Sequence, residues 1–251
     1  MPVGGSARVR ADDVTSLYDE SVELTLSSGH RVRAIVRTDP RQSNRPKCLL
    51  LHGNPGSLVD WERVLPRITA ICDAAVVDMP GFGRSSPPTL VPAGLSLNRM
   101  AEDAIAVADS LGWSEPIFLA GHSHGGGVAQ TVAANVPARV AGIVLLGTLG
   151  SPAHASYRLL SLLGASSATQ LAGWLFRRRV LRALNRKILR GFMSDVFSPE
   201  QVTAAKADRE LAIFCARPEI LLSMVHVSLG QPCEQLLGSA SRIRCPVLCV
   251  A

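Results

Sequence analysis

Residues 117–140 read IFLAGHSHGGGVAQTVAANVPARV, and Ser123 stands where two patterns meet. The preceding run, 116–121, is short and apolar, as in a buried strand, whereas 125–136 is rich in small residues and typical of a helix. The join, GHSHG at 121–125, matches Gly-x-Ser-x-Gly, whose glycines leave room for a sharp, strained turn. The stretch therefore predicts a nucleophile elbow that raises Ser123 at the carboxyl end of a strand. A glycine-rich turn with a structural role alone is the alternative.

Short apolar runs without strict alternation recur along the chain. They lie at 47–53, 74–81, 116–121, 140–147 and 246–251. Such runs are typical of parallel strands covered on both faces. Residues 21–38 predict a hairpin before them, and helices are expected at 60–70, where Pro66 is a candidate breaker, and at 96–112. This order predicts an α/β fold with a mostly parallel central sheet and flanking helices.

The alternation of strands and helices fails between residues 149 and 239. Helical stretches follow one another there without a strand, at 156–165, 170–192, 199–216 and 218–229. We therefore expect three parts: a core at 1–148, a helical cap or lid at 149–239, and a return to the core at 240–251.

Composition excludes several classes of protein. Of the 251 residues 47% are hydrophobic and 18% charged, which suits a packed core. Much of the net charge of +6 comes from 176–190, so we expect no nucleic-acid partner. No apolar run approaches the roughly 18 residues of a membrane span, and the N-terminus lacks a signal-peptide pattern, so we expect a cytoplasmic protein. The six cysteines show no metal-binding spacing and are expected to be reduced core residues.

Three motifs each follow a predicted strand: HGNPG at 52–56, DMPGFGRS at 78–85 and GHSHGG at 121–126. In this order and spacing they resemble the α/β-hydrolase superfamily, from about residue 20 to the end of the chain. The resemblance implies the α/β-hydrolase fold and matches the helical block to that family's variable cap. It also implies that Asp78, Arg84 and His52 are architectural residues.

The predicted site consists of Ser123 as nucleophile and the backbone N–H groups of Asn54 and His124 as oxyanion hole. This set predicts a serine hydrolase that forms an acyl-enzyme on an ester or related acyl substrate, mainly a hydrophobic one. Such chemistry requires neither a metal nor an organic cofactor. The side chains of His122 and His124 adjoin Ser123 but cannot easily reach its hydroxyl across the elbow.

The resemblance places the acid and the histidine of the triad after the strand at 246–251. We therefore expect a C-terminally truncated chain, without the last strand, the last helix and two triad members, whose activity is impaired. No carboxylate follows the strand at 140–147. His154 lacks an orienting acid, and His226 lies among apolar neighbours in the cap, so neither is expected to replace the missing base.

Other functions stay open. Haloalkane dehalogenases and epoxide hydrolases of this fold use an aspartate where Ser123 stands, which argues against both. A hydrolase that cleaves a carbon–carbon bond next to a carbonyl would use the same groups as an esterase. A catalytically dead relic or binding protein is the alternative from another class. The basic, amphipathic stretch 176–192 could contact an anionic membrane surface, although a cap helix with its charges in water is the simpler interpretation.

Overall fold

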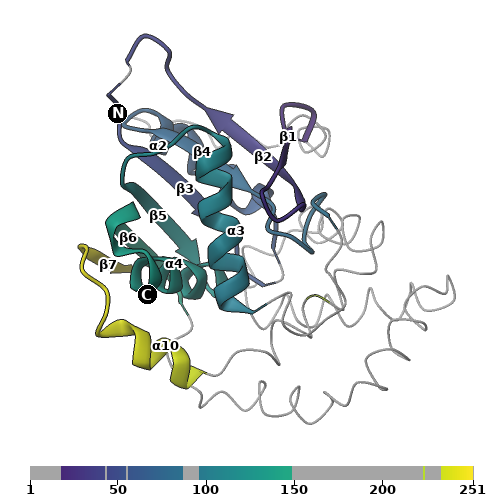
Figure 1. Ribbon diagram of the computed structural model, residues 1–251. Coiled ribbons are helices and arrows are strands. Elements are labelled where there is room, and N and C mark those ends of the chain that lie inside the picture. The colour runs from purple at the N-terminus through teal and green to yellow at the C-terminus, as the bar shows by residue number, and fades with distance from the viewer. Residues whose placement is uncertain are drawn as a thin grey trace, which may run out of the picture.

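A seven-stranded sheet forms the centre of the computed structural model, which describes residues 18–42, 44–54, 56–86, 96–148, 223 and 233–250 (Figure 1). Its strands are β1 (Val22–Thr25), β2 (Arg31–Arg37), β3 (Lys47–Leu51), β4 (Asp73–Val77), β5 (Ile117–His122), β6 (Val140–Leu146) and β7 (Val247–Val250). The helices are η1 (Leu58–Trp61), α2 (Leu65–Thr69), α3 (Leu97–Ser110), α4 (His124–Asn135), η3 (Pro137–Arg139) and α10 (Cys233–Ala240).

The strand order is β1-β2-β4-β3-β5-β6-β7. The two N-terminal strands pair antiparallel, and every pair from β4 to β7 is parallel. In the register of these pairs Leu51 lies opposite both Val77 and Gly121, so β3, β4 and β5 end at one edge. The loops that follow these three strands therefore meet there, as expected for the carboxyl edge of a parallel sheet.

The structure confirms the predicted fold class, the hairpin and all five apolar strands, with shifts of a few residues at their ends. The expected helix at 96–112 forms α3, where the Ser96 hydroxyl accepts from the Arg99 N–H and Gly112 follows at φ +72°. The expected helix at 60–70 is confirmed in part. Residues Leu65–Thr69 form α2, and η1 precedes it. Pro66 lies in the first turn of α2, where its missing N–H costs nothing.

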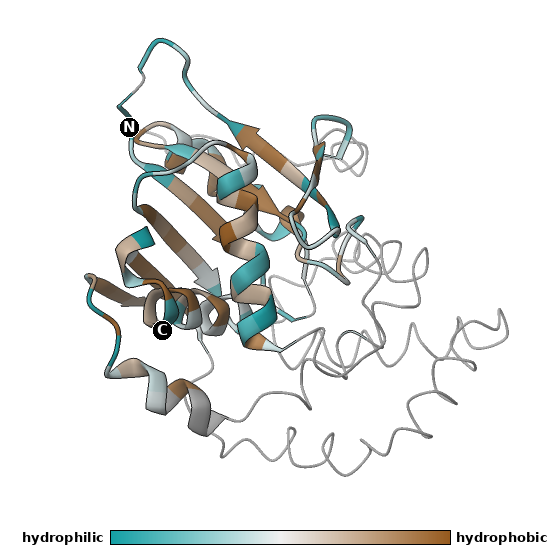
Figure 2. Ribbon diagram, viewed as in Figure 1, coloured by the Kyte–Doolittle hydropathy of each residue, from teal (hydrophilic) through white to brown (hydrophobic). Residues whose placement is uncertain are grey.

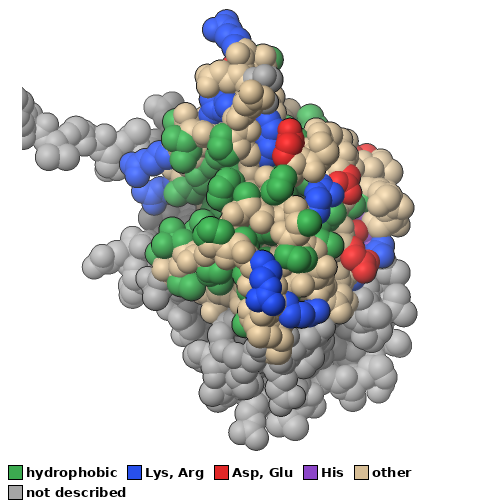
Figure 3. All heavy atoms as spheres, turned by 60° about the vertical axis from the view of Figure 1, so that its left-hand side comes forward, with side chains coloured by type: hydrophobic (Ala, Val, Ile, Leu, Met, Phe, Trp, Pro, Cys, Tyr) green, Lys and Arg blue, Asp and Glu red, His purple; other side chains and the backbone are tan. Residues whose placement is uncertain are grey.

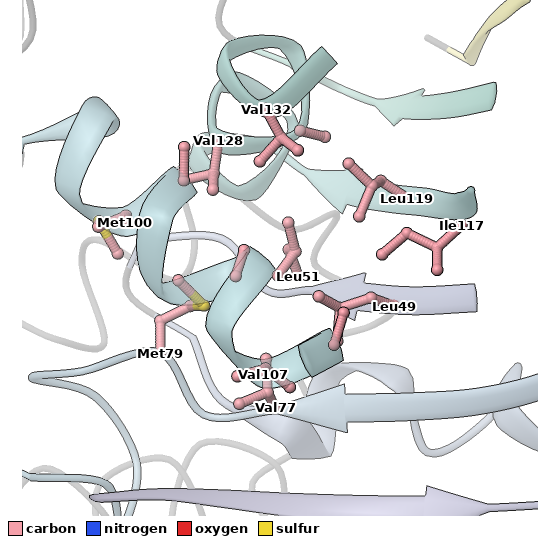
Figure 4. Close-up of a cluster of buried hydrophobic side chains, with 14 of the residues drawn as sticks. Leu49, Leu51, Val77, Met79, Met100, Val107, Ile117, Leu119, Val128 and Val132 are labelled. Carbon is pink, nitrogen blue, oxygen red and sulfur yellow. The ribbon is translucent and has the colours of Figure 1, made fainter. Parts of the chain in front are cut away.

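One face of the sheet is covered by α3 and α4 (Figure 1). Side chains of β3, β4 and β5 meet side chains of both helices in a buried apolar cluster (Figure 4). The residues labelled there are Leu49, Leu51, Val77, Met79, Met100, Val107, Ile117, Leu119, Val128 and Val132. Figure 2 shows the hydrophobic strands behind α3, whose outer side is hydrophilic. This packing rigidly supports the strand ends that carry the predicted site.

The opposite face of the sheet is covered over β3 and β4 by η1 and α2. Leu58, Trp61 and Leu65 pack there with Leu50 and other strand residues. Over β5 and β7 large apolar side chains are exposed: 40% of Phe118, 58% of Leu248 and 46% of Val250. Figure 3 turns this side of the molecule forward and shows hydrophobic side chains gathered on its surface.

Four cysteines whose side chains the structure describes are free thiols, but they do not share one environment. Cys48 and Cys72 are buried, Cys245 is half-buried and Cys249 is exposed. The expectation that Cys249 is a core residue is therefore wrong: it lies on β7, whose side chains are exposed. An apolar sequence run does not distinguish a covered strand from a strand at the end of the sheet.

Helix α10 packs against α4, and its Leu236 joins the buried cluster. This helix precedes residue 240, where we expected the core to resume. Ser223, the one described residue between 149 and 232, is buried and donates to the Gly81 carbonyl at 2.9 Å. The proposed helical stretches and the basic segment 176–192 otherwise lie outside the described residues, so the division of the chain stays a prediction. No helix in the described ranges is long and apolar enough to cross a bilayer.

Candidate functional site

Ser123 occupies the turn between β5 and α4 with φ 50° and ψ −114°. It is the only described residue other than glycine with a positive φ. A side chain in this conformation costs on the order of 1–3 kcal/mol and persists only where the surroundings enforce it. One such constraint is a hydrogen bond from the Ser123 N–H to the carbonyl of Leu146, at the end of β6, at 2.9 Å. The predicted elbow therefore has the expected strained backbone.

The glycines on either side of Ser123 have the predicted steric reason. A Cβ on Gly121 would lie 2.3 Å from the carbonyl oxygen of Gly125. A Cβ on Gly125 would lie 2.3 Å from the carbonyl oxygen of Leu51 and 2.5 Å from that of His52. All these neighbours are backbone atoms, which cannot rotate away. The elbow is thus pressed onto the end of β3, where the loop with Asn54 begins.

The loop after β3 lies directly against the serine. A Cβ on Gly53 would lie 3.3 Å from the Cβ of Ser123 and 2.9 Å from Nδ1 of His122. Asn54, whose N–H we expect in the oxyanion hole, is the next residue. The second expected donor, His124, is the first residue of α4. The structure thus gathers the predicted residues at one edge of the sheet, and the roles of the two amides stay predictions.

The buried side chain of His52 links the loop after β3 to the loop after β4. Its Nε2 accepts from the Met79 N–H at 3.1 Å, so the ring proton belongs on Nδ1, which donates to the Gly53 carbonyl at 2.7 Å. Burial lowers the pKa of His52 from 6.5 to about 4, although the Gly53 hydrogen bond opposes this shift. The ring is therefore neutral at pH 7. Phe82 lies edge-on to it, with ring centroids 5.2 Å apart.

His124 is also buried, with 3% of its surface exposed. Burial, with a smaller contribution from His52, lowers the pKa of His124 from 6.5 to about 3. A neutral imidazole at the start of α4 avoids placing a second positive charge at the positive end of the helix dipole. The positive end of the helix dipole there favours a developing negative charge.

Asp78, the first residue of the second motif, links its own loop to the segment that follows the first motif and to Tyr18. This fully buried carboxylate accepts from the N–H of Leu58 at 2.6 Å, from the N–H of Arg84 at 2.8 Å and from the hydroxyl of Tyr18 at 3.0 Å. Gly83 sits at φ +49°, and a Cβ there would overlap the Asp78 side chain. These contacts agree with the architectural role that the resemblance implied for Asp78 and Arg84.

Sequence reasoning missed two parts of this network. Tyr18 precedes every recognised motif, so no sequence pattern marks it. Its hydroxyl binds Asp78, and its ring centroid lies 4.1 Å from the guanidinium carbon of Arg84. Ser85 closes the loop by donating to the Asp78 carbonyl at 2.6 Å and accepting from the N–H of Arg33 at 2.8 Å. Burial and then the charge of Asp78 raise the pKa of Tyr18, which keeps its hydroxyl a donor.

The two cap histidines, His154 and His226, lie outside the described residues, so the expectation that neither replaces the base stays a prediction. Thr148, which follows β6, places a buried hydroxyl beside α4, where a Cβ on Gly126 would meet it at 2.0 Å. Among the described residues Thr148 Oγ1 has no hydrogen-bond partner. Within the same residues no three His, Cys, Asp or Glu side chains are grouped to hold a metal ion.

Known proteins resemble this chain in sequence and in fold. Epoxide hydrolase B of Mycobacterium tuberculosis is 33% identical over 135 residues, which cover 49% of this chain and 37% of that protein. The 2-hydroxymuconate semialdehyde hydrolase of a Pseudomonas species is 35% identical over 125 residues, which cover 47% of this chain and 42% of that protein. The matched segment thus spans less than half the length of either relative.

A solved structure of a putative α/β hydrolase from Nostoc superimposes with a TM-score of 0.66 at 20% identity, covering 92% of this chain and 79% of that one. This likeness concerns the fold alone. The family model described as alpha/beta hydrolase fold matches residues 49–196, more than half of the chain, including the loop after β3, Asp78 and the elbow at Ser123. The chain therefore belongs to the α/β-hydrolase fold family.

Proposed function

We propose that this member of the family is a serine hydrolase that acts on a carboxylic ester or a related acyl compound. The observation that carries the proposal is the backbone of Ser123, the only strained non-glycine residue in the described part of the chain. Strain of this kind is typical of positions that present a reactive side chain, and the glycines at 121 and 125 leave the room that such a turn needs.

In the proposed reaction the Ser123 hydroxyl attacks the substrate carbonyl carbon, and the carbonyl oxygen becomes an oxyanion. The backbone N–H groups of Asn54 and His124 would donate to that oxyanion. Collapse of the tetrahedral intermediate expels the alcohol and leaves an acyl-enzyme, which water hydrolyses in a second step. The contact of Gly53 with the Ser123 side chain supports this assignment, because it brings the loop with Asn54 to the nucleophile.

The serine needs a base to accept its proton. His52 does not suit this role, because both of its ring nitrogens are engaged by backbone groups. His124 does not suit it either, since its ring is buried, its pKa is lowered to about 3, and it follows Ser123 directly. We assign neither residue as the base, and the activation of Ser123 is what the experiment must measure.

A fluorophosphonate probe tests the proposal, because it labels only activated serines. We expect the chain to be labelled, Ser123→Ala to abolish labelling, and Ser110→Ala, a control at an exposed serine of α3, to retain it. Hydrolysis of short-chain p-nitrophenyl esters should follow the same pattern. Labelling that survives in Ser123→Ala would contradict the proposal, as would a wild-type chain that neither reacts with the probe nor hydrolyses the esters. The latter result would favour the non-catalytic binding protein.

A second candidate is hydrolysis of a carbon–carbon bond next to a carbonyl. The similarity to 2-hydroxymuconate semialdehyde hydrolase favours it over other acyl chemistry. A chain that cleaves a vinylogous diketone faster than an ester of similar size would support this candidate. The similarity to epoxide hydrolase B does not lead us to propose epoxide hydrolysis, because an alkyl-ester intermediate requires a carboxylate where this chain has Ser123.

A further inference from the structure

The elbow of Ser123 is held from both sides by the strands that flank β5. In the sheet β5 lies between β3 and β6, so the turn that follows it has a neighbouring strand end on each side. On one side Gly125 is pressed against the carbonyls of Leu51 and His52 at the end of β3. On the other side the Leu146 carbonyl, at the end of β6, accepts from the Ser123 N–H at 2.9 Å.

Thr148, two residues beyond the end of β6, makes a second contact with the elbow. Apart from atoms of its own helix and chain neighbours, the three atoms nearest to a Cβ on Gly126 would be Oγ1, Cγ2 and Cβ of Thr148, at 2.0, 2.7 and 2.9 Å. The Thr148 side chain therefore occupies the space that a side chain at Gly126 would need. Gly126 is the third residue of α4, and its N–H donates to the Ser123 carbonyl at 3.1 Å. The contact thus bears on the turn that begins at the nucleophile.

Gly147 allows both contacts to come from one short segment. Its φ of +49° lies in the left-handed region, which glycine adopts at little cost, so the chain turns sharply between Leu146 and Thr148. The Gly147 N–H donates to the carbonyl of Val250, at the end of β7, at 2.9 Å. Residues 146–148 are therefore fixed to the next strand of the sheet while they contact the elbow.

The Thr148 side chain contributes its shape to this contact. Its Oγ1 is buried and has no hydrogen-bond partner in the part of the chain that the structure describes. Three side-chain atoms, two of them carbon, fill the space beside Gly126. A valine has the same branched shape without the hydroxyl and would fill the same space.

We propose that Thr148 is a positioning residue for the nucleophile elbow. His124, whose N–H is the expected oxyanion donor, lies between two points that the segment after β6 holds. Ser123, which precedes it, is bonded to the Leu146 carbonyl. Gly126, which follows it, is in contact with the Thr148 side chain. Holding both points fixes the direction of the His124 N–H relative to the Ser123 hydroxyl.

The role of Thr148 in catalysis rests on the proposed function, because the direction of the His124 amide affects a reaction only where Ser123 is reactive. An oxyanion donor is effective when it is already aimed at the position that the oxyanion will occupy. Loss of the Thr148 contact should therefore slow the chemical step and leave substrate binding almost unchanged.

Thr148→Gly tests this expectation, because it removes all three contacting atoms. We expect the rate constant of fluorophosphonate labelling to fall about 10- to 100-fold, as for a small misplacement of a catalytic group. In the hydrolysis of p-nitrophenyl acetate kcat should fall with it, whereas KM should change little. All rates are compared at a temperature at which circular dichroism shows each variant to be folded. Thr148→Ala, which removes two of the three atoms, serves if the glycine variant does not fold.

Compensating variants test whether the contact itself carries the effect. Gly126→Ala places a methyl group in the space of the Thr148 side chain and should also slow labelling. The double variant Gly126→Ala/Thr148→Gly fills that space with the methyl group and should be labelled faster than either single variant. The conservative variant Thr148→Val should restore a rate close to that of the wild type. The control Thr131→Val removes a buried hydroxyl that donates to the Gly127 carbonyl at 2.8 Å, and should lower stability without slowing labelling.

Hydrogen exchange of the Ser123 amide, followed by NMR, separates this inference from the proposed function, because it requires no activity. We expect this amide to exchange about tenfold faster in Thr148→Gly than in the wild type, since its bond to the Leu146 carbonyl opens more often. A wild-type chain without labelling would contradict the proposed function, and exchange would then decide alone: an equal rate in Thr148→Gly overturns the positioning role. In a labelled wild type the labelling rates decide. The role is then overturned by an unchanged rate in Thr148→Gly, by a double variant no faster than the single ones, or by a Thr148→Val as slow as Thr148→Gly.

Discussion

Nδ1 of His52 lies 2.7 Å from the carbonyl oxygen of Gly53 and donates its proton to it. The direction follows from the other side of the ring, where Nε2 accepts from the Met79 N–H. A protonated ring would have no acceptor at Nε2 and would place two donors against each other. The conformation of the loop that leads to Asn54 therefore depends on a neutral imidazole.

The stability of the fold should consequently depend on pH. His52 and His124 have pKa values lowered to about 4 and about 3, whereas unfolded histidines titrate near 6.5. Below pH 6.5 the unfolded chain binds protons that the folded chain does not. The free energy of unfolding should be constant above about pH 7 and fall as the pH drops towards 4, by up to about 1.4 kcal/mol per pH unit for each histidine.

Urea denaturation between pH 8 and pH 4.5 measures this dependence. The variant His52→Gln can still donate and accept but does not titrate, so its slope below pH 6.5 should be shallower than that of the wild type. A wild-type stability that stays level down to pH 4.5 would rule out the neutral, buried state of both rings.

The glycines of the elbow should not tolerate a methyl group. Because the new Cβ of Gly121→Ala or Gly125→Ala would meet backbone atoms at 2.3 Å, we expect each to lower the free energy of unfolding by about 3 kcal/mol or more. Gly238→Ala is the matched control: nothing lies within 4 Å of its Cβ, and it should stabilise α10 by about 0.5–1 kcal/mol. Equal effects at all three positions would show that backbone contact does not explain the elbow glycines.

The Asp78 carboxylate should contribute more to stability than an exposed one. Asp78→Asn exchanges an acceptor for an amide whose NH₂ faces donors of Leu58, Arg84 and Tyr18, and should cost about 2–4 kcal/mol. The control Asp109→Asn weakens the ion pair between Asp109 and Arg139. The Asp109 side chain is 55% exposed, so this change should cost less than about 1 kcal/mol. Chemical denaturation of both variants compares the two costs; similar values would refute the anchoring role of Asp78.

The two buried threonine hydroxyls near α4 should respond oppositely to removal. Thr131 donates to the Gly127 carbonyl at 2.8 Å, so Thr131→Val should cost about 1 kcal/mol. Thr148 Oγ1 is buried with no partner among the described residues, so Thr148→Val should be neutral or stabilise by about 1 kcal/mol. Thermal melts of both variants test this prediction. A loss of stability in Thr148→Val as large as in Thr131→Val would mean that the Thr148 hydroxyl is hydrogen-bonded in the native protein.

Much of the fold could be read from local patterns. Apolar runs such as 47–53 are long enough to bury one strand each, and the 3.6-residue period of Leu97, Met100, Ala104 and Val107 is that of the helix face that is indeed buried. Pro66 shows the limit of such reading. The residue could break, end or begin a helix. In the structure it lies in the first turn of α2, whose first residue, Leu65, packs into the buried cluster.

The candidate site, like the fold, could be predicted from the sequence only in part. The sequence by itself determined the elbow, because Gly-x-Ser-x-Gly between a strand and a helix is a local steric requirement, and it determined the order of the three motifs. Only the tertiary structure decided that Gly53 lies against Ser123, that Tyr18 completes the Asp78 network and that Cys249 is exposed. Each of these depends on the order and register of strands distant in sequence, which no local pattern encodes.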